Sequence, residues 1–200
     1  MNDSRKYILK IAFQLFMQKS YKEVTLKEIV EKTKLSKGAF YHYFPSKEQL
    51  FMEVIDSYYY AYLNVDYLKF SQDNLKDFYN GILEQMQAEI NKMSTEFQVD
   101  DKVVPMNYYL LIFDAINLLP GFRKRVIEIS DREFEQWRKI VSTARAKGEI
   151  SSPMTDELIA KTFIRINDGA GIYFILEGNV EKMNFEIKEL WDAFYNHIKT

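Results

Sequence analysis

The sequence of 200 residues contains no cysteine, two histidines, four prolines and seven glycines. Without cysteine there can be no disulfide framework, no thiolate metal site and no cysteine nucleophile. The sequence also shows no nucleophile–base pair, metal-ligand cluster or glycine-rich phosphate loop, although an acid–base site made from Asp or Glu stays open. We therefore expect no catalytic residue, no metal and no cofactor, and an enzyme is the least favoured class of function.

Long apolar runs are missing as well. No window of about 18 residues is free of charge, so we expect no membrane span and no membrane partner. Residues 7–17 are apolar, but Lys10 and Gln14 interrupt them and no small-residue cleavage site follows. A secretion signal is therefore not expected, and cytoplasmic residence is the default expectation.

Neither sign of charge is in large excess, because the formal net charge is only -2. The positive and negative residues are, however, unevenly spread along the chain. Residues 1–50 hold ten Lys or Arg against five Asp or Glu, a net charge of +5. Residues 51–200 hold seventeen against twenty-four, a net charge of -7. A basic N-terminal part on an acidic remainder is typical of a protein in which only the first part meets phosphate, with random scatter as the alternative.

Apolar residues return every three or four positions along most of the chain, and neither strand-like alternation nor an internal repeat is visible. This rhythm predicts an all-α fold of about nine helices. Four of them start near residues 3, 25, 36 and 46, the last continuing to about residue 62. The others are expected near 75–93, 106–116, 122–146, 152–177 and 187–198, and Gly148 should stop the seventh.

Three capping signals lie close together near the N-terminus. Thr25 with Glu28, and Ser46 with Gln49, match the capping-box pattern, and Ser36 is placed to cap the helix between them. Leu35 just before that cap and Phe40 within the helix are spaced as a hydrophobic staple. Short capped helices joined by a tight turn are typical of a helix-turn-helix that enters the major groove of DNA.

A helix that begins at Ser36 would turn Phe40, Tyr43 and Phe44 inward and present its other side to DNA. Lys37 could reach a guanine edge or phosphate, and Gly38 would allow close backbone approach. For each residue alone, solvation or packing is an equally good interpretation; their joint arrangement favours DNA. The candidate DNA-binding residues are Thr25, Ser36, Lys37, Gly38, Ala39, Tyr41, His42 and Lys47.

Residues of fixed type recur at fixed spacing within about residues 5–52: Phe16, Tyr21, Val24-Thr25, Ile29, Leu35 to Phe44 and Ser46 to Leu50. Through these residues the N-terminal segment resembles the TetR family of bacterial transcriptional regulators. This resemblance implies a helix-turn-helix domain at 1–46 and a larger ligand-binding and dimerisation domain at 47–200. It further implies a homodimer that pairs through its last two helices, binds a palindromic operator in double-stranded DNA and is released as a repressor by a small-molecule inducer.

Two positions depart from the family pattern. Ser20 stands where a glycine is usual, and Thr33-Lys34-Leu35 replaces an Ala-Gly-Val type of turn. If Lys34 must adopt a positive φ, the cost is about 1 kcal/mol relative to glycine. Neither departure removes a proposed DNA contact.

The C-terminal part offers aromatic, methionine and amide side chains for a pocket between helices that takes a small hydrophobic or amphipathic ligand. Plain core packing is the more common role of such stripes. Asp114 and Asp168 could face a cationic ligand, but solvated or capping roles are the alternative. The candidate ligand-binding residues are Tyr79, Met86, Tyr109, Phe113, Asn117, Phe163 and Asn167.

Dimerisation is suggested by the small residues Gly169, Ala170 and Gly171, which would permit close helix approach, and by Trp191, Phe194 and Tyr195 near the C-terminus. An interface of about 800 Å² per partner would be ordinary. The competing function is a helical ligand-binding or scaffold protein without sequence-specific DNA binding.

Overall fold

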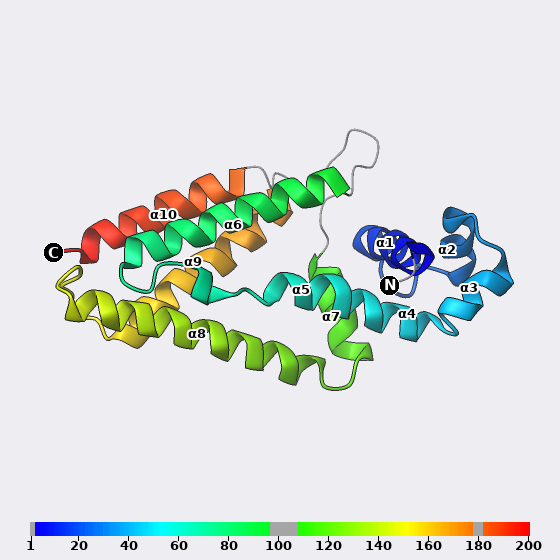
Figure 1. Ribbon diagram of the computed structural model, residues 1–200, viewed down its shortest axis with the longest axis horizontal. Coiled ribbons are helices and arrows are strands. Elements are labelled where there is room, and N and C mark those ends of the chain that lie inside the picture. Colours follow the sequence, from blue (N-terminus) through cyan, green and yellow to red (C-terminus); the bar gives the residue numbers. More distant parts are fainter. Residues whose placement is uncertain (1–2, 97–107, 178–181) are drawn as a thin grey trace. The chain divides into compact units, whose positions relative to one another are not determined.

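The computed structural model describes residues 3–96, 108–177 and 182–200, and it confirms the all-α prediction (Figure 1). Within these ranges the only extended pairing is an isolated antiparallel bridge between Ile150 and Lys199. The helices are α1 (Asp3–Gln18), α2 (Leu26–Thr33), α3 (Lys37–Tyr43), α4 (Lys47–Val54), η1 (Ile55–Tyr59), α5 (Tyr60–Leu63), η2 (Tyr67–Lys69), α6 (Leu75–Glu96), α7 (Tyr108–Leu118), α8 (Phe122–Ala146), α9 (Asp156–Glu177) and α10 (Met183–Ile198).

The chain divides into two compact units. Unit 1 contains Met1–Val65 and Val99–Val126, and unit 2 contains Asp66–Gln98 and Ile127–Thr200. This division concerns packing, and it places α4 in unit 1, where the ring centroids of Phe16 on α1 and Phe51 on α4 lie 5.0 Å apart. The boundary between DNA-binding and ligand-binding functions at residues 46 and 47 stays a prediction.

The core of unit 1 forms where short helices bury their apolar stripes against one another. From α1 it takes Ile8, Ala12 and Phe16, and from α3 and the residue after it Phe40 and Phe44, all essentially inaccessible to solvent. The guanidinium of Arg5 lies over the Phe44 ring, 5.0 Å from its centroid. Aromatic anchors behind α3 therefore fix which side of this helix faces outward.

One long helix runs from Lys47 to Leu63, but its middle turn, η1, is π-helical. The sequence predicts this helix as far as residue 62 but not the wider turn inside it. Around the turn, Tyr58 stacks on Phe13 of α1 at 4.4 Å, and Tyr60 packs against Phe122 at 5.7 Å. The extra residue of a π turn redirects the side chains that follow it. Tyr58 and Tyr60, two positions apart, therefore pack against different partners, Phe13 and Phe122.

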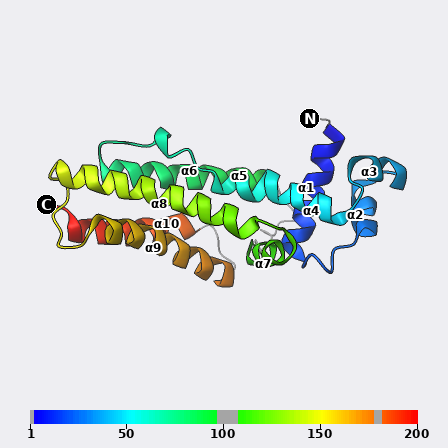
Figure 2. The same ribbon diagram turned by 90° about the horizontal axis from the view of Figure 1, so that it is seen from below.

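Unit 2 is organised around an aromatic cluster. Trp137 of α8 stacks on Phe163 of α9 at 5.0 Å and meets Trp191 of α10 edge-on at 5.3 Å. The Trp191 indole N–H donates to the Phe163 carbonyl at 2.9 Å, which satisfies a buried donor. Helix α10 packs against both α6 and α9 (Figures 1 and 2).

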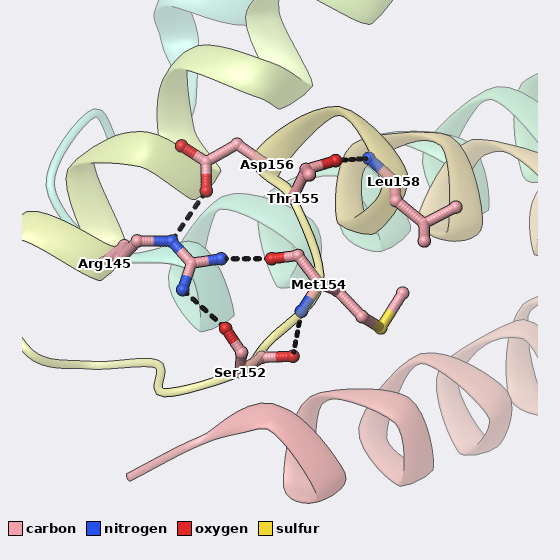
Figure 3. A network of polar contacts seen from close by, with 6 residues as sticks. All are labelled: Arg145, Ser152, Met154, Thr155, Asp156 and Leu158. Carbon is pink, nitrogen blue, oxygen red and sulfur yellow. Dashed lines mark hydrogen bonds and ion pairs between the residues drawn. The ribbon is translucent and has the colours of Figure 1, made fainter.

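The connection from α8 to α9 is held by one arginine (Figure 3). Helix α8 ends as predicted at Ala146, and Gly148 follows at φ +75°, which favours glycine. The Arg145 guanidinium then donates to Asp156 Oδ1 at 2.7 Å and to the carbonyls of Ser152 at 2.8 Å and Met154 at 2.7 Å. Because these residues are held as a loop, the prediction that Ser152 opens the helix is wrong by four residues: α9 starts at Asp156.

No helix of the described ranges is both long and apolar enough to cross a membrane. Nor do the described His, Asp and Glu side chains form a group of three or more that could hold a metal ion.

Candidate DNA-binding interface

The turn between α2 and α3 has the geometry of a helix-turn-helix. Thr25 caps α2, its Oγ1 accepting a hydrogen bond from Glu28 N at 3.1 Å, and Ser36 caps α3, its Oγ accepting one from Ala39 N at 3.2 Å. Lys34 between them adopts φ 56° and ψ 20°, the left-handed conformation that the sequence departure required. Both predicted caps are confirmed, although the Glu28 carboxylate pairs with Lys19 Nζ at 2.6 Å.

Helix α3 presents a mixed basic, small and aromatic surface. Phe40 and Phe44 are buried, whereas Lys37, Gly38, Tyr41 and His42 are exposed, Tyr41 by 47%. We call these four exposed residues the α3 surface. Nothing lies within 4 Å of a Cβ built on Gly38, so the chain itself does not require glycine there. A helical glycine costs about 1 kcal/mol relative to alanine, and the role of Gly38 in close approach to DNA stays a prediction.

The remaining DNA-binding candidates differ in how accessible they are. Thr25 and Ser36 are exposed at the N-termini of α2 and α3, while Ala39 is half-buried. Hydroxyl groups at helix N-termini, beside unpaired backbone N–H groups, are suited to a phosphate. Their roles in DNA contact stay predictions.

Lys47 takes a position that the sequence did not indicate. It was expected to bring a cation to the phosphodiester, but its Nζ donates to the carbonyls of Tyr21 at 2.8 Å and Val24 at 2.9 Å. The same ammonium lies 4.0 Å from the centroid of the Tyr21 ring, and desolvation lowers the pKa of Lys47. Its charge is thus directed into unit 1, where it joins the start of α4 to the α1–α2 loop.

A carboxylate on α7 completes this junction. Asp114 Oδ2 accepts a hydrogen bond from Tyr21 N at 2.7 Å, across 93 positions of sequence. Burial, together with the neighbouring Glu48 carboxylate, raises the pKa of Tyr21 to about 12, so the phenol stays neutral at physiological pH. Sequence reasoning did not find this contact; the only signal was a carboxylate within the apolar stripe of residues 109–116.

The ligand-binding candidates are distributed over both units. In unit 2, Tyr79 and Phe163 are buried in the aromatic cluster, and the Tyr79 hydroxyl donates to Asp192 Oδ1 at 2.7 Å. These two therefore have the core-packing role that the sequence left open. Met86 and Asn167 are half-buried in unit 2. In unit 1, α7 carries Tyr109, which is half-buried, and the exposed Phe113 and Asn117.

An open groove of about 680 Å³ lies between α6 and α10. None of the seven ligand-binding candidates lines it. Its walls are formed by Asp77, Asn80, Gly81, Leu83, Glu84, Gln87, Asn184, Phe185 and Lys188.

The family model described as "Bacterial regulatory proteins, tetR family" matches residues 8–54 of this chain. This match covers α2, α3 and α4 and residues 8–18 of α1, and α3 with its surface lies inside it. Residues 8–54 therefore form an N-terminal segment of the TetR-family type.

Individual relatives agree in the same region. Over 59 residues, 30% of this chain, it is 46% identical to the uncharacterised HTH-type transcriptional regulator YuxN of Bacillus subtilis. Over 61 residues, also 30% of the chain, it is 34% identical to the HTH-type transcriptional repressor NemR of Escherichia coli. These matches span only 20% and 31% of the relatives' own lengths, respectively.

Similarity over the whole chain is weaker in sequence but clear in fold. The HTH-type transcriptional repressor DhaR of a Mycobacterium species is 21% identical over 94% of this chain and 91% of its own length. The crystal structure of reduced E. coli NemR matches with a TM-score of 0.64 at 19% identity, covering 100% of this chain and 99% of that one. These relatives are named as transcriptional regulators or repressors rather than enzymes.

Proposed function

We propose that this protein is a dimeric transcriptional regulator whose α3 surface reads an operator in double-stranded DNA. The observation that carries the proposal is the exposure of Lys37, Gly38, Tyr41 and His42 on one side of a helix anchored from behind by Phe40 and Phe44. Lysine, an open backbone and aromatic polar tips are groups that contact base edges and phosphates. In this regulator residues 1–46 would form the DNA-binding domain, and residues 47–200 would form the ligand-binding and dimerisation domain.

Repression and release by a ligand are the finer part of the proposal. NemR and DhaR are both named as repressors, which favours repression over activation. The ligand would be small and hydrophobic or amphipathic, since the exposed face of α7 offers Phe113 beside Asn117. A cytoplasmic location follows from a target in the chromosome.

A homodimer through α9 and α10 is supported by the outward faces of these helices. Ile172 and Tyr173 on α9 and Leu190 on α10 are exposed, and no atom lies within 4 Å of a Cβ built on Gly169. A second copy of the chain, packed closely against Gly169, would offset the cost of a glycine within a helix and would cover the apolar side chains. Trp191 and Tyr195, expected to serve the interface, are instead buried within unit 2.

Sedimentation of a charged variant tests the dimer. We expect the parent to sediment as a dimer and Ile172→Glu as a monomer, because an interfacial carboxylate without a partner is costly. The matched control is Leu68→Glu on η2, where the side chain is 71% exposed. A parent that sediments as a monomer at micromolar concentration would reject the dimer.

Electrophoretic mobility shift and footprinting with the DNA upstream of the chain's own gene test the main proposal. The intact protein should protect two half-sites whose centres are about 34–36 Å apart or a multiple of that spacing. The control variant Lys139→Ala, an exposed lysine of α8 in unit 2, should shift DNA like the parent. No shift at low salt would favour a helical ligand-binding or scaffold protein without sequence-specific DNA binding.

A further inference from the structure

Three elements of unit 1 meet at the backbone of one residue. Tyr21, in the loop between α1 and α2, gives its N–H to Asp114 on α7 and its carbonyl to Lys47 at the start of α4. The Val24 carbonyl, two residues before α2 begins at Leu26, accepts a second bond from the same ammonium. The loop that leads into the helix-turn-helix is therefore attached from both sides by charged groups.

The two charged groups also act on each other. The Asp114 carboxylate is one of the negative charges that oppose the lowering of the Lys47 pKa by desolvation. The Asp114 carboxylate and the Lys47 ammonium thus hold the two sides of the Tyr21 backbone by charge-assisted hydrogen bonds, the type that is shorter and stronger than bonds between neutral groups. The Tyr21 side chain is also packed, since the centroids of the Tyr21 and Phe51 rings lie 5.0 Å apart. Displacement of one of these groups would disturb the others.

Helix α7 is placed to be moved by a ligand. Its outward side carries Phe113, which is 60% exposed, and Asn117, while Leu111 and Ala115 are buried. Asp114 is half-buried and bonded to the loop. A helix moves nearly as a rigid body, so a molecule that binds the outward side and shifts α7 would carry the Asp114 carboxylate with it.

We propose that Asp114 is a positioning residue through which α7 sets the placement of the α1–α2 loop and of the N-terminus of α4, and so the operator affinity of the α3 surface. The inference rests on the proposed function and names the contact through which that function is regulated. Intact bonds hold the arrangement that binds operator, and a ligand that displaces α7 weakens binding by breaking the Asp114–Tyr21 bond. Asp114 itself does not touch DNA.

The experiment measures operator affinity and Tyr21 amide exchange in the full-length protein. The probes are a fluorescent duplex carrying the footprinted sequence and deuterium exchange. Asp114→Ala removes the acceptor, and Asp114→Asn keeps an acceptor without the charge. The matched control Asp131→Asn makes the same charge change on an exposed side chain of α8.

We expect Asp114→Ala to bind operator about 5-fold or more weakly, with the Asn variant in between and the control equal to the parent. Exchange at Tyr21 should become about tenfold faster in Asp114→Ala, while far-UV circular dichroism stays that of the parent. If the Ala variant does not fold, the Asn variant alone decides between these outcomes. If the Asp114 side chain acted only by its size, operator affinity would not fall in steps with the strength of the acceptor from Asp through Asn to Ala.

Two results would overturn the inference while leaving the proposed function intact. One is parent-like operator affinity in Asp114→Ala despite faster exchange, since the bond would then exist without positioning anything. The other is unchanged exchange at Tyr21, since the carboxylate would then not hold the amide. A parent that binds no upstream DNA is a different failure: it rejects the proposed function, and this inference with it.

Discussion

Units 1 and 2 are both helical, but they use polar side chains in different ways. In unit 1 the helices α2, α3 and α4 have seven or eight residues each, and a hydroxyl group caps every one of them. In unit 2 the helices α6, α9 and α10 have 16 to 22 residues and pack around an aromatic cluster. A short helix leaves a large share of its backbone N–H groups unpaired, so its caps matter more.

The difference explains where the chain resembles other proteins. Caps, turn residues and outward side chains in unit 1 each tolerate few residue types, and the family model matches there, at residues 8–54. Core positions of a long helix accept many apolar residues of suitable volume. Similarity across the whole chain is accordingly low in sequence, at 19% with the NemR structure, although the fold is shared.

The largest expected effect tests whether the aromatic cluster carries the stability of unit 2. Trp137 is 1% exposed and contacts Phe78, Phe163 and Trp191. Trp137→Ala should lower the free energy of unfolding by about 3–5 kcal/mol, because it leaves a large cavity. Urea unfolding at fixed protein concentration measures this. The control Phe185→Ala, at an exposed site, should change it by less than about 0.5 kcal/mol; a loss below about 1 kcal/mol for Trp137→Ala would contradict the prediction.

The second prediction separates binding from stability in unit 1. Lys37→Ala and Tyr41→Ala should each weaken operator binding by about 1–3 kcal/mol, if they contact bases, without lowering the midpoint of unfolding. If Lys37 contacts a phosphate instead, its replacement should reduce the slope of log affinity against log salt concentration by about one for each lost phosphate contact. Fluorescence anisotropy at several salt concentrations distinguishes these outcomes. Parent-like binding by Tyr41→Ala would remove Tyr41 from the contacts.

The third prediction concerns a carboxyl group of unit 2. Desolvation raises the pKa of Glu133 on α8; a bond from Tyr67 and the charge of Arg165 oppose this shift, and the charge of Asp168 adds to it. A raised folded-state pKa favours the protonated form, so the stability contribution is present at low pH and is lost as pH rises through the folded pKa. Glu133→Gln should therefore raise Tm by about 2–4 °C at pH 8, with the gain shrinking toward pH 4. A gain that grows on acidification would reverse the assigned sign.

The smallest effect tests the strained turn of unit 1. Lys34 at φ 56° should cost about 0.5–1 kcal/mol relative to glycine, so Lys34→Gly should stabilise the protein by that amount. Lys32→Gly, which removes the same charge inside α2, should instead destabilise it by about 1 kcal/mol. Denaturant midpoints of the two variants should move in opposite directions. Shifts of the same sign would show that charge rather than backbone conformation governs this turn.

Much of unit 1 could be predicted because its signals are local. The caps at Thr25, Ser36 and Ser46 each join a side chain to an N–H group three residues later, and the conformation of Lys34 follows from the turn it occupies. The exposed side of α3 follows from the spacing of Phe40 and Phe44. By contrast, apolar spacing alone could not separate pocket from core in unit 2, and both Tyr79 and Phe163 are in the core.

The sequence by itself determined the caps of α2, α3 and α4 and the outward side chains of α3, since these depend on groups within about four residues of one another. The tertiary structure alone decided which distant groups meet. It turned Lys47 toward backbone carbonyls more than 20 positions away, placed Asp114 on Tyr21 across 93 positions, and put Glu149 on the N–H of Leu75 across 74. The physical reason is that such bonds depend on how whole helices pack, and no local pattern encodes that.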